Sequence, residues 1–268
     1  MKSSQNLIGK SFYLNFKPIR SKQALRIACK HNFREIQAEL GAHSHIDAAK
    51  IHLNQSLVPK LTTSELMQHV TGVIDSYEER QSRRIRKDAV IAIEVLFSLP
   101  VAAEEIPIIE YFEDCLAWTL EQFKPGEILT ADIHFDEAAP HMHVILLAIT
   151  ASALHGAKIK GNKYGNHLRQ QHFCDNVAAK YGLQKPPARL SKSDRVKAAK
   201  KVLSAIESSA DPLTQSSHFQ LIKRAIEEDP APWAQSLGIE IEVTPAEKRT
   251  FVQIMTSKGK GPQWQPDV

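Results

Sequence analysis

Two strand-like segments joined by a short polar turn constrain the fold of this chain most strongly. Residues 128–135 and 141–149 are rich in apolar and β-branched residues, which favours β-strands. The turn between them spans residues 136–140, so the two segments are predicted to form a hairpin. Any fold proposed for this chain must therefore accommodate a pair of antiparallel strands.

Helix-like and strand-like segments alternate along the rest of the chain. Residues 88–99 are almost continuously apolar, which is typical of an inner strand covered on both faces. Residues 21–40 repeat apolar side chains at the helical period, and Gly41 follows as a stop signal. Another strand is expected at residues 11–16, and further helices at residues 64–83, 108–123, 166–181, 193–208 and 216–228. This pattern predicts an α+β fold with a central antiparallel β-sheet and flanking helices.

The length of 268 residues allows one large domain with a small appendage. We expect the main domain to cover residues 1–210, because the segments that suggest chemistry all lie there. Residues 211–268 are expected to form a small C-terminal accessory segment with a helix and two strand-like runs, at 239–243 and 250–255.

Three histidines flank the predicted turn. His141 and His143 are two residues apart and therefore share one face of their strand. The hairpin brings His134 opposite them, at roughly 5–8 Å between cross-strand and diagonal neighbours. Three imidazoles in this arrangement are predicted to bind one divalent ion at about 2.0–2.2 Å, leaving positions open for water or substrate. Exposed surface histidines on an edge hairpin are the alternative interpretation.

The identity of the metal is less constrained than its site. Three histidines alone favour Zn²⁺ or another transition metal. The two acids in the turn, Asp136 and Glu137, make Mn²⁺ or Mg²⁺ the more reasonable ion, since these metals prefer oxygen ligands.

Basic residues gather in two blocks on either side of the histidines. Arg80, Arg83, Arg84, Arg86 and Lys87 form the first block. The second block, residues 158–201, holds twelve Lys or Arg residues, including Lys158 and Lys160. A solvated helix face explains one such run, but two blocks around a histidine-rich centre favour a polyanionic partner.

The three cysteines are far apart and form no CxxC pair, which indicates reduced thiols in the cytoplasm. The apolar stretches are too short to span a membrane, and the N-terminus lacks the apolar core of a secretory signal. We therefore expect a cytoplasmic protein with no membrane partner.

The pattern HxDExxPHxH, complete from His134 to His143, resembles the third motif of the MobV or Mob/Pre (plasmid recombination enzyme) family of plasmid mobilisation relaxases. These are single-strand DNA endonucleases with a two-histidine core. Residues 30–34 resemble the first motif of the family, and the segments at 45–47 and 52–54 resemble the stretch directly after that motif. Residues 84–90, which lead into Glu94, resemble its basic segment before a strand. Phe33 departs from the family pattern, in which an acid is commoner, and no long coiled-coil tail is found.

The resemblance implies a sheet-based fold and a metal-dependent reaction on plasmid DNA. Family enzymes nick one strand at an origin of transfer by transesterification and keep the 5′-phosphate covalently bound, for plasmid mobilisation or recombination. The histidine of the first motif, thought to be the nucleophile, falls on His31, and the acid thought to activate it falls on Glu94. The implied partner is the origin of transfer, as single strand and as supercoiled duplex. A coupling protein or an accessory DNA-binding protein is a further candidate partner.

The residues themselves are consistent with these roles but leave alternatives open. His31 and Arg34 are three apart on the predicted helix and so share a face, which could also be plain surface. Tyr13 is the competing nucleophile. Glu94 is an acid in an otherwise apolar strand, where a carboxylate is costly unless it is paired with an arginine or serves a function, His31 being the sharper candidate partner. Glu137 is favoured over Asp136 for a role beside the metal.

Contacts to DNA phosphates are expected from the arginines and lysines. The predicted DNA-binding set is Arg34, Asn54, Arg83, Arg84, Arg86, Lys87, Lys158 and Lys160.

Other functions fit parts of the pattern. A replication-initiator or transposase-type nuclease shares the histidine motif but relies on a tyrosine helix after it. A three-histidine zinc hydrolase of small molecules would need a deep closed pocket. A non-catalytic DNA-binding protein would have no use for open metal positions.

Overall fold

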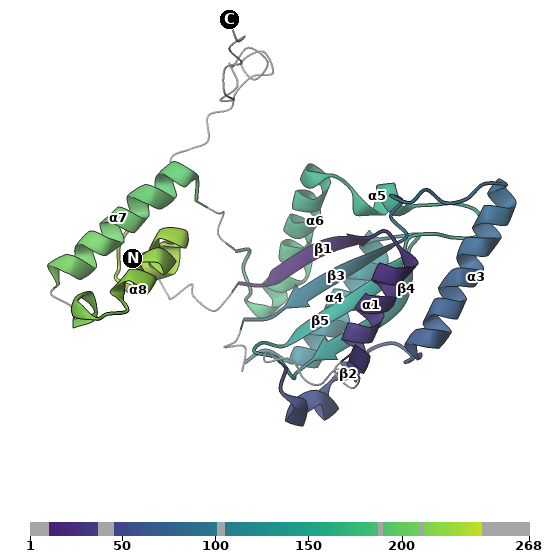
Figure 1. Cartoon of the computed structure of the whole chain (residues 1–268), viewed down its shortest axis with the longest axis horizontal. Helices are drawn as coiled ribbons and strands as arrows, with labels where there is room; N and C mark the ends of the chain where they lie inside the picture. The colour runs from purple at the N-terminus through teal and green to yellow at the C-terminus, as the bar shows by residue number, and fades with distance from the viewer. Residues whose placement is uncertain (1–10, 37–45, 101–104, 187–189, 210–211, 243–268) are drawn as a thin grey trace, which may run out of the picture. The chain divides into compact units, whose positions relative to one another are not determined.

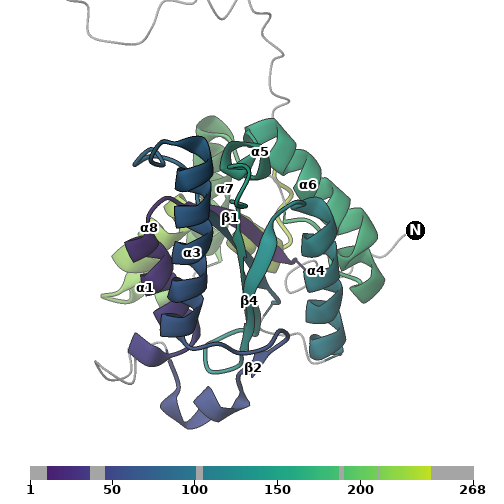
Figure 2. The same ribbon diagram turned by 90° about the vertical axis from the view of Figure 1, so that its right-hand side faces the viewer.

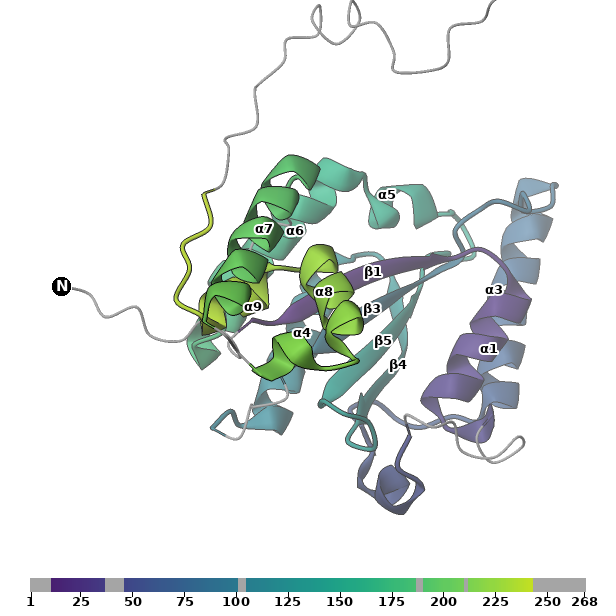
Figure 3. The same ribbon diagram turned by 60° about the vertical axis from the view of Figure 1, so that its left-hand side comes forward.

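A five-stranded antiparallel sheet forms the centre of the computed structural model, which describes residues 11–36, 46–100, 105–186, 190–209 and 212–242 (Figure 1). The strands lie side by side in the order β1-β3-β5-β4-β2, and Figure 3 shows the first four in that sequence. Their bounds are β1 Tyr13–Ile19, β2 Gln55–Ser56, β3 Ala92–Ser98, β4 Glu127–His134 and β5 His141–Leu147. The sheet thus pairs the predicted hairpin, β4 and β5, with the apolar strand β3.

Helices cover both faces of this sheet. Figure 2 shows α1 and α3 on one side of the strands and α4 and α6 on the other. The bounds are α1 Lys22–Asn32, α3 Thr63–Gln81, α4 Ile108–Gln122, α5 Gly156–Lys160 and α6 Lys163–Asn176, with short 3-10 turns η1 Ala48–Leu53 and η2 Ala178–Tyr181. The layered arrangement confirms the α+β prediction.

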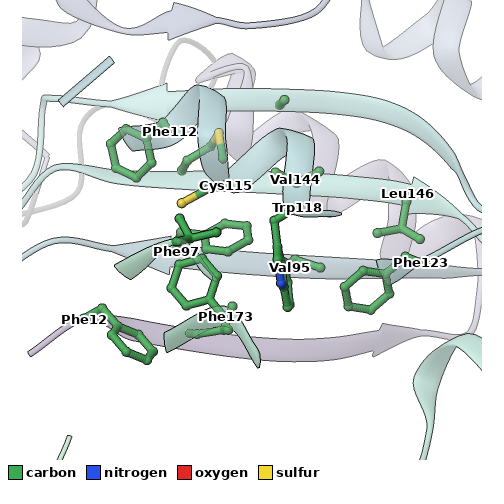
Figure 4. Close-up of a cluster of buried hydrophobic side chains, with 14 of the residues drawn as sticks. Phe12, Val95, Phe97, Phe112, Cys115, Trp118, Phe123, Val144, Leu146 and Phe173 are labelled. Carbon is green, nitrogen blue, oxygen red and sulfur yellow. The ribbon is translucent and has the colours of Figure 1, made fainter. Parts of the chain in front are cut away.

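The face under α4 and α6 is closed by aromatic side chains. Figure 4 shows Phe112, Trp118 and Phe123 packing with Phe97 of β3 and Phe173 of α6, all of them buried. Rings of this size remove much apolar surface from water, which makes this layer the rigid support of the sheet.

The opposite face is covered only in part. Helices α1 and α3 bury Leu25, Val70 and Ile145 there, together with one end of the strands β1, β3, β4 and β5. Towards the other end, Tyr13 of β1 is half exposed and the three histidines of the hairpin replace apolar residues. The three histidines therefore lie on the face of the sheet that the helices cover less completely.

The first helix is shorter than the predicted residues 21–40. Helix α1 ends at Asn32, because Arg34 adopts a left-handed backbone conformation with φ 61°. Glu35 and Ile36 are helical again, and the expected end at Leu40 and Gly41 lies outside the described residues. The short elements η1, β2 and α5 have too few residues to show a period, and the sequence did not predict them.

The chain divides into two units, Met1–Pro187 and Ala188–Val268. In the second, α7 Lys192–Ser208 packs with α8 Phe219–Glu228 and α9 Ala231–Ser236, next to η3 Pro212–Gln215. The boundary therefore lies earlier than the predicted 210/211, because the apolar face of α7 belongs to the second core. Residues 239–242 form no strand, and the expected run at 250–255 lies outside the described part of the chain.

A search of the described helices finds none with the length and apolar character that crossing a membrane requires.

Candidate active site

The three predicted metal ligands converge on one face of the hairpin. His134 pairs directly with His141 in the β4–β5 register, and His143 follows two residues along β5. The Nδ1 atom of His134 lies 3.2 Å from Nε2 of His141, and the three rings are 5.0–5.1 Å apart between centroids. One nitrogen from each ring lies within 4.8 Å of the others, a spacing that allows them to share one ion.

Each imidazole uses its other nitrogen for a hydrogen bond within the protein. Nε2 of His134 lies 2.9 Å from the Asn32 carbonyl, and Nδ1 of His141 lies 2.9 Å from the Ala139 carbonyl. Nδ1 of His143 lies 2.9 Å from the Glu94 carboxylate. Since all three partners are acceptors, each ring donates outwards and presents a lone pair inwards, as metal-bound histidines do.

The electrostatic setting keeps two of these ligands neutral. Burial, together with the charges of His143 and Arg34, lowers the pKa of His134 to about 2. Burial also lowers the pKa of His141. Neutral imidazoles are the form that binds a metal, so the burial of His134 and His141 favours binding of a divalent ion.

The hairpin turn carries a buried ion-pair network. The Arg34 guanidinium donates to both oxygens of Asp136, Nε to Oδ2 at 2.8 Å and NH2 to Oδ1 at 2.6 Å, and to Glu137 at 2.9 Å. The Asn54 amide donates to Asp136 at 2.8 Å and accepts from the Phe135 N–H at 2.8 Å. Despite burial, the hydrogen bonds from Arg34 and Asn54 lower the pKa of Asp136. This network fixes the turn against the end of α1.

Two residues predicted to contact DNA, Arg34 and Asn54, make their contacts within the protein. Arg34 is 5% exposed and its guanidinium is engaged by the two turn acids, so it does not present itself to phosphates. The Asn54 amide is likewise occupied on both sides by the turn. Sequence spacing could not reveal this, because both partners are about 80 to 100 residues away along the chain.

His31 lies beside the three histidines. Its ring centroid is 5.9 Å from that of His143 and 6.4 Å from that of His134. Burial, the charge of His143 and that of Arg34 lower its pKa. The competing nucleophile Tyr13 faces the same side of the sheet, but the register places it on β1, two strands away from His141.

Glu94 is paired, although with neither of the partners considered from the sequence. Its carboxylate accepts from His143 and lies 3.3 Å from Nζ of Lys17. Against the effect of burial, the His143 hydrogen bond and the charges of His143 and Lys17 lower the pKa of Glu94 to about 2. The acid is therefore ionised and hydrogen-bonded to His143, one of the three predicted metal ligands. It borders the same cavity as His31.

Glu137 lies at the rim of the cluster. Its Oε1 atom is 3.7 Å from Nε2 of His141 and, with His134 and Asp136, it forms a second group whose ligand atoms lie within 4.8 Å. This is the position that the sequence favoured for an acid beside the metal.

The predicted basic contacts lie at the other end of the sheet. Leu147, at the far end of β5 from His141, pairs with Ala92, the first residue of β3, about 20 Å away along the strand. The end of α3, which leads into the basic loop, meets the segment before α5 at that end, since Gln81 donates to the Ser152 carbonyl at 3.2 Å. The exposed basic residues there are Arg83, Arg84, Arg86, Lys87, Lys158 and Lys160, with Arg86 paired to Asp88 at 2.6 Å.

Asp132 is a buried acid that the sequence reading missed. It faces His143 in the β4–β5 register, burial raises its pKa, and its Oδ2 has no hydrogen-bond partner among the described residues. Its position two residues before His134, on the same strand face, is the signal that could have found it.

Comparison with known proteins places this site in a family. The Mob_Pre model, described as plasmid recombination enzyme, matches residues 11–198. Plasmid recombination enzyme type 3 of Staphylococcus aureus is 29% identical over 156 residues, covering 54% of this chain and 36% of that relative. The plasmid recombination enzyme of Bacillus thuringiensis is 28% identical over 125 residues, covering 45% and 27%. The matches thus span well under half the length of these relatives.

Solved structures share the fold. The MobM relaxase domain, in an Mn-bound crystal structure with plasmid pMV158 oriT DNA, has a TM-score of 0.54 at 21% identity, covering 66% of this chain and 90% of that domain. A second structure, with a 3′-thiophosphate on the DNA, gives 0.54 at 22% identity. With the family model matched over well over half of its length, the chain belongs to the plasmid recombination enzyme family.

Proposed function

We propose that this protein is a relaxase that nicks one DNA strand at a plasmid origin of transfer and keeps the 5′-phosphate covalently bound. The observation that carries the proposal is the convergence of three imidazoles on one point, with a fourth, His31, about 6 Å away between ring centroids. Family membership and the DNA in the MobM structures support the same reaction class.

In this mechanism His31 attacks phosphorus. A nitrogen–phosphorus bond forms, the bond to the 3′ oxygen breaks, and the released 3′ oxygen takes up a proton. The lowered pKa of His31 supports the role, because only a neutral imidazole has a lone pair to donate. The product is a phosphoramidate on His31 and a free 3′ hydroxyl.

His134, His141 and His143 would hold the metal. Mn²⁺ is the first candidate, since the MobM structures are Mn-bound, with Mg²⁺ and Zn²⁺ as the alternatives. When bound, a divalent ion supplies Lewis-acid polarisation of a phosphoryl oxygen.

Two acids complete the proposed machinery. Glu94 would orient His143 and, from the cavity it shares with His31, accept or stabilise the proton that His31 carries. Glu137 would add a carboxylate oxygen at the rim, near His141.

The wider DNA contacts are assigned to the basic end of the sheet. Its exposed arginines and lysines would bind phosphates of a segment away from the nick. Plasmid DNA is the proposed partner, with a coupling or accessory DNA-binding protein as a second, and the cytoplasm as the proposed location.

A nicking assay tests the proposal. Supercoiled plasmid carrying the cognate origin is incubated with Mn²⁺, and the products are scored for a nick and for protein on the 5′ end. Wild type should give both, and EDTA or His141→Ala should abolish them while most DNA affinity remains. Nicking that persists in EDTA would reject the metal role.

The chemistry of the adduct identifies the nucleophile. A phosphoramidate is labile to acid and stable to alkali, whereas a tyrosine phosphodiester resists acid better. We expect an acid-labile adduct that is lost in His31→Ala and kept in Tyr13→Phe. An acid-stable adduct that survives His31→Ala would assign the reaction to Tyr13.

A further inference from the structure

A cavity of about 770 Å³ lies between helix α1 and the edge strand β1. We call it the α1–β1 groove. Ile27 lines it from the helix, Asn15 and Lys17 from β1, and Leu96 from β3. Its volume lies within the range of sites that enclose small organic ligands. Apart from its innermost end, the site described above makes no use of it.

One end of the groove is the candidate active site. His31, Glu94 and His143 all border it, so a molecule in the groove would touch the nucleophile and a metal ligand. At its other end, Arg20 borders it. The hydrogen bond from Arg86 and its charge lower the pKa of Asp88, and the charge of Arg20 adds a smaller effect in the same direction. The groove therefore leads from the histidines towards the basic end of the sheet.

The walls of the groove combine apolar side chains with a lysine ammonium group and an asparagine amide. Ile27 is 50% exposed, so it presents apolar surface to the groove beside the candidate active site. Lys17 is 68% exposed although its Nζ contacts Glu94, and Asn15 is exposed on β1. A nucleotide has the complementary chemistry. Its base has flat apolar faces and hydrogen-bonding edges, and its phosphate carries negative charge.

We infer that the α1–β1 groove binds the nucleotide next to the scissile phosphate, with its base between Ile27 and Leu96 and its outer phosphate towards Lys17 and Arg20. Asn15 is then a specificity-determining residue, because an amide reads base edges by donating and accepting at once. The inference rests on the proposed function, which supplies the single strand and the point of cleavage.

Filling the groove tests this directly. Ile27→Trp is compared with Leu120→Trp, a change at an equally exposed apolar residue on α4, on the other side of the sheet. The readout is fluorescence anisotropy of a labelled oligothymidylate of about 12 nucleotides and of a duplex of the same length. Ile27→Trp should weaken single-strand binding at least about fivefold, because the indole would occupy the space of the base, and leave duplex binding unchanged. Leu120→Trp should change neither.

Two further variants at exposed residues test the inference without disturbing the core. Asn15→Ala should alter the ranking of oligo-dT, oligo-dA and oligo-dC without altering the salt dependence. Arg20→Ala should lower the salt slope for single strands by about 0.7, the value for one phosphate contact. Unchanged single-strand affinity in Ile27→Trp, or equal losses on both DNA forms, would overturn the inference.

Failure of the groove inference and failure of the proposed function give different results. If the groove is wrong, wild type still nicks the plasmid while these variants bind as wild type does. If the relaxase proposal is wrong, no nick or 5′ adduct appears with wild type, whatever the binding results.

Discussion

At the scale of single residues, the three imidazoles of the hairpin differ in the groups that hold them in place. His134 and His141 donate to backbone carbonyls, whereas His143 donates to the carboxylate of Glu94. A carboxylate partner raises the basicity of a ligand imidazole more than a neutral carbonyl does. Glu94 should therefore affect metal affinity without touching the ion.

Glu94→Gln should weaken Mn²⁺ binding by about 10- to 100-fold, the usual cost of losing such an outer partner. Isothermal titration of the metal-free protein with MnCl₂ measures it. Glu127→Gln is the matched control, since this exposed acid pairs with His69 on the surface. Equal affinities for wild type and Glu94→Gln would show that the carboxylate does not tune the site.

His134 should make the metal-free protein sensitive to acid. Folding lowers its pKa from 6.5 to about 2, so the unfolded chain binds the proton first as the pH falls. Its effect on stability is thus full above pH 6.5 and decreases below it, by about 2 kcal/mol at about pH 5.

Urea unfolding in EDTA at about pH 7.5 and pH 5 checks this. His134→Gln should lose less stability between the two pH values than wild type, and His167→Gln, at an exposed histidine on α6, should lose as much as wild type. The same loss in all three proteins would contradict the assignment.

At the scale of elements, the hairpin turn is held by segments from far along the chain. Arg34 follows the end of α1, Asn54 follows η1, and both converge on Asp136. The Asp47 N–H also donates to the Asp136 carbonyl at 2.7 Å. The turn between His134 and His141 is therefore fixed by contacts made outside the hairpin.

Arg34→Ala should destabilise the protein by about 3–5 kcal/mol, because it leaves the buried Asp136 without its charged partner. Arg86→Ala removes an ion pair of equal length, 2.6 Å, that is exposed on both sides, and should leave the urea midpoint unchanged. Similar midpoints for the two variants would mean that the buried network adds little stability.

The local sequence pattern predicted the hairpin, the apolar strand β3 and the convergence of the histidines. These features depend on the alternation of apolar residues and on turn length, which are visible within about 20 consecutive residues. It did not predict the end of α1 at Asn32, because the apolar stripe continues through Phe33 while the break depends on Arg34 reaching Asp136. The Glu94–His143 pair was missed for the same reason. It depends on the alignment of β3 with β5, which no local signal contains.

At the scale of the whole molecule, each unit has its own core. Val202, Leu203 and Ile206 of α7 pack with Ile226 of α8 in the second unit. A fragment ending at residue 187 should fold and bind Mn²⁺ with the affinity of the full chain. A fragment ending at residue 210 would keep α7 without its partners and should self-associate, which size-exclusion chromatography measures. A monomeric longer fragment would contradict this division.

The basic end of the sheet should dominate the salt dependence of duplex binding. Replacing Arg83, Arg84 and Lys87 by Ala should flatten the slope of log affinity against log salt by about 0.9 for each phosphate that the protein no longer neutralises. Lys124→Ala, at an exposed lysine after α4, is the control and should not change it. An unchanged slope in the triple variant would place the duplex elsewhere.

The alternation along β5 links folding and chemistry in one further way. His141 and His143 face the site while Met142 and Val144 face the aromatic core, so a one-residue slip of this strand would exchange metal ligands for thioether and alkyl groups and bury two imidazoles among rings. A misaligned sheet would lose its packing and its metal together. A chain that binds the ion through all three imidazoles would therefore also have the native strand alignment.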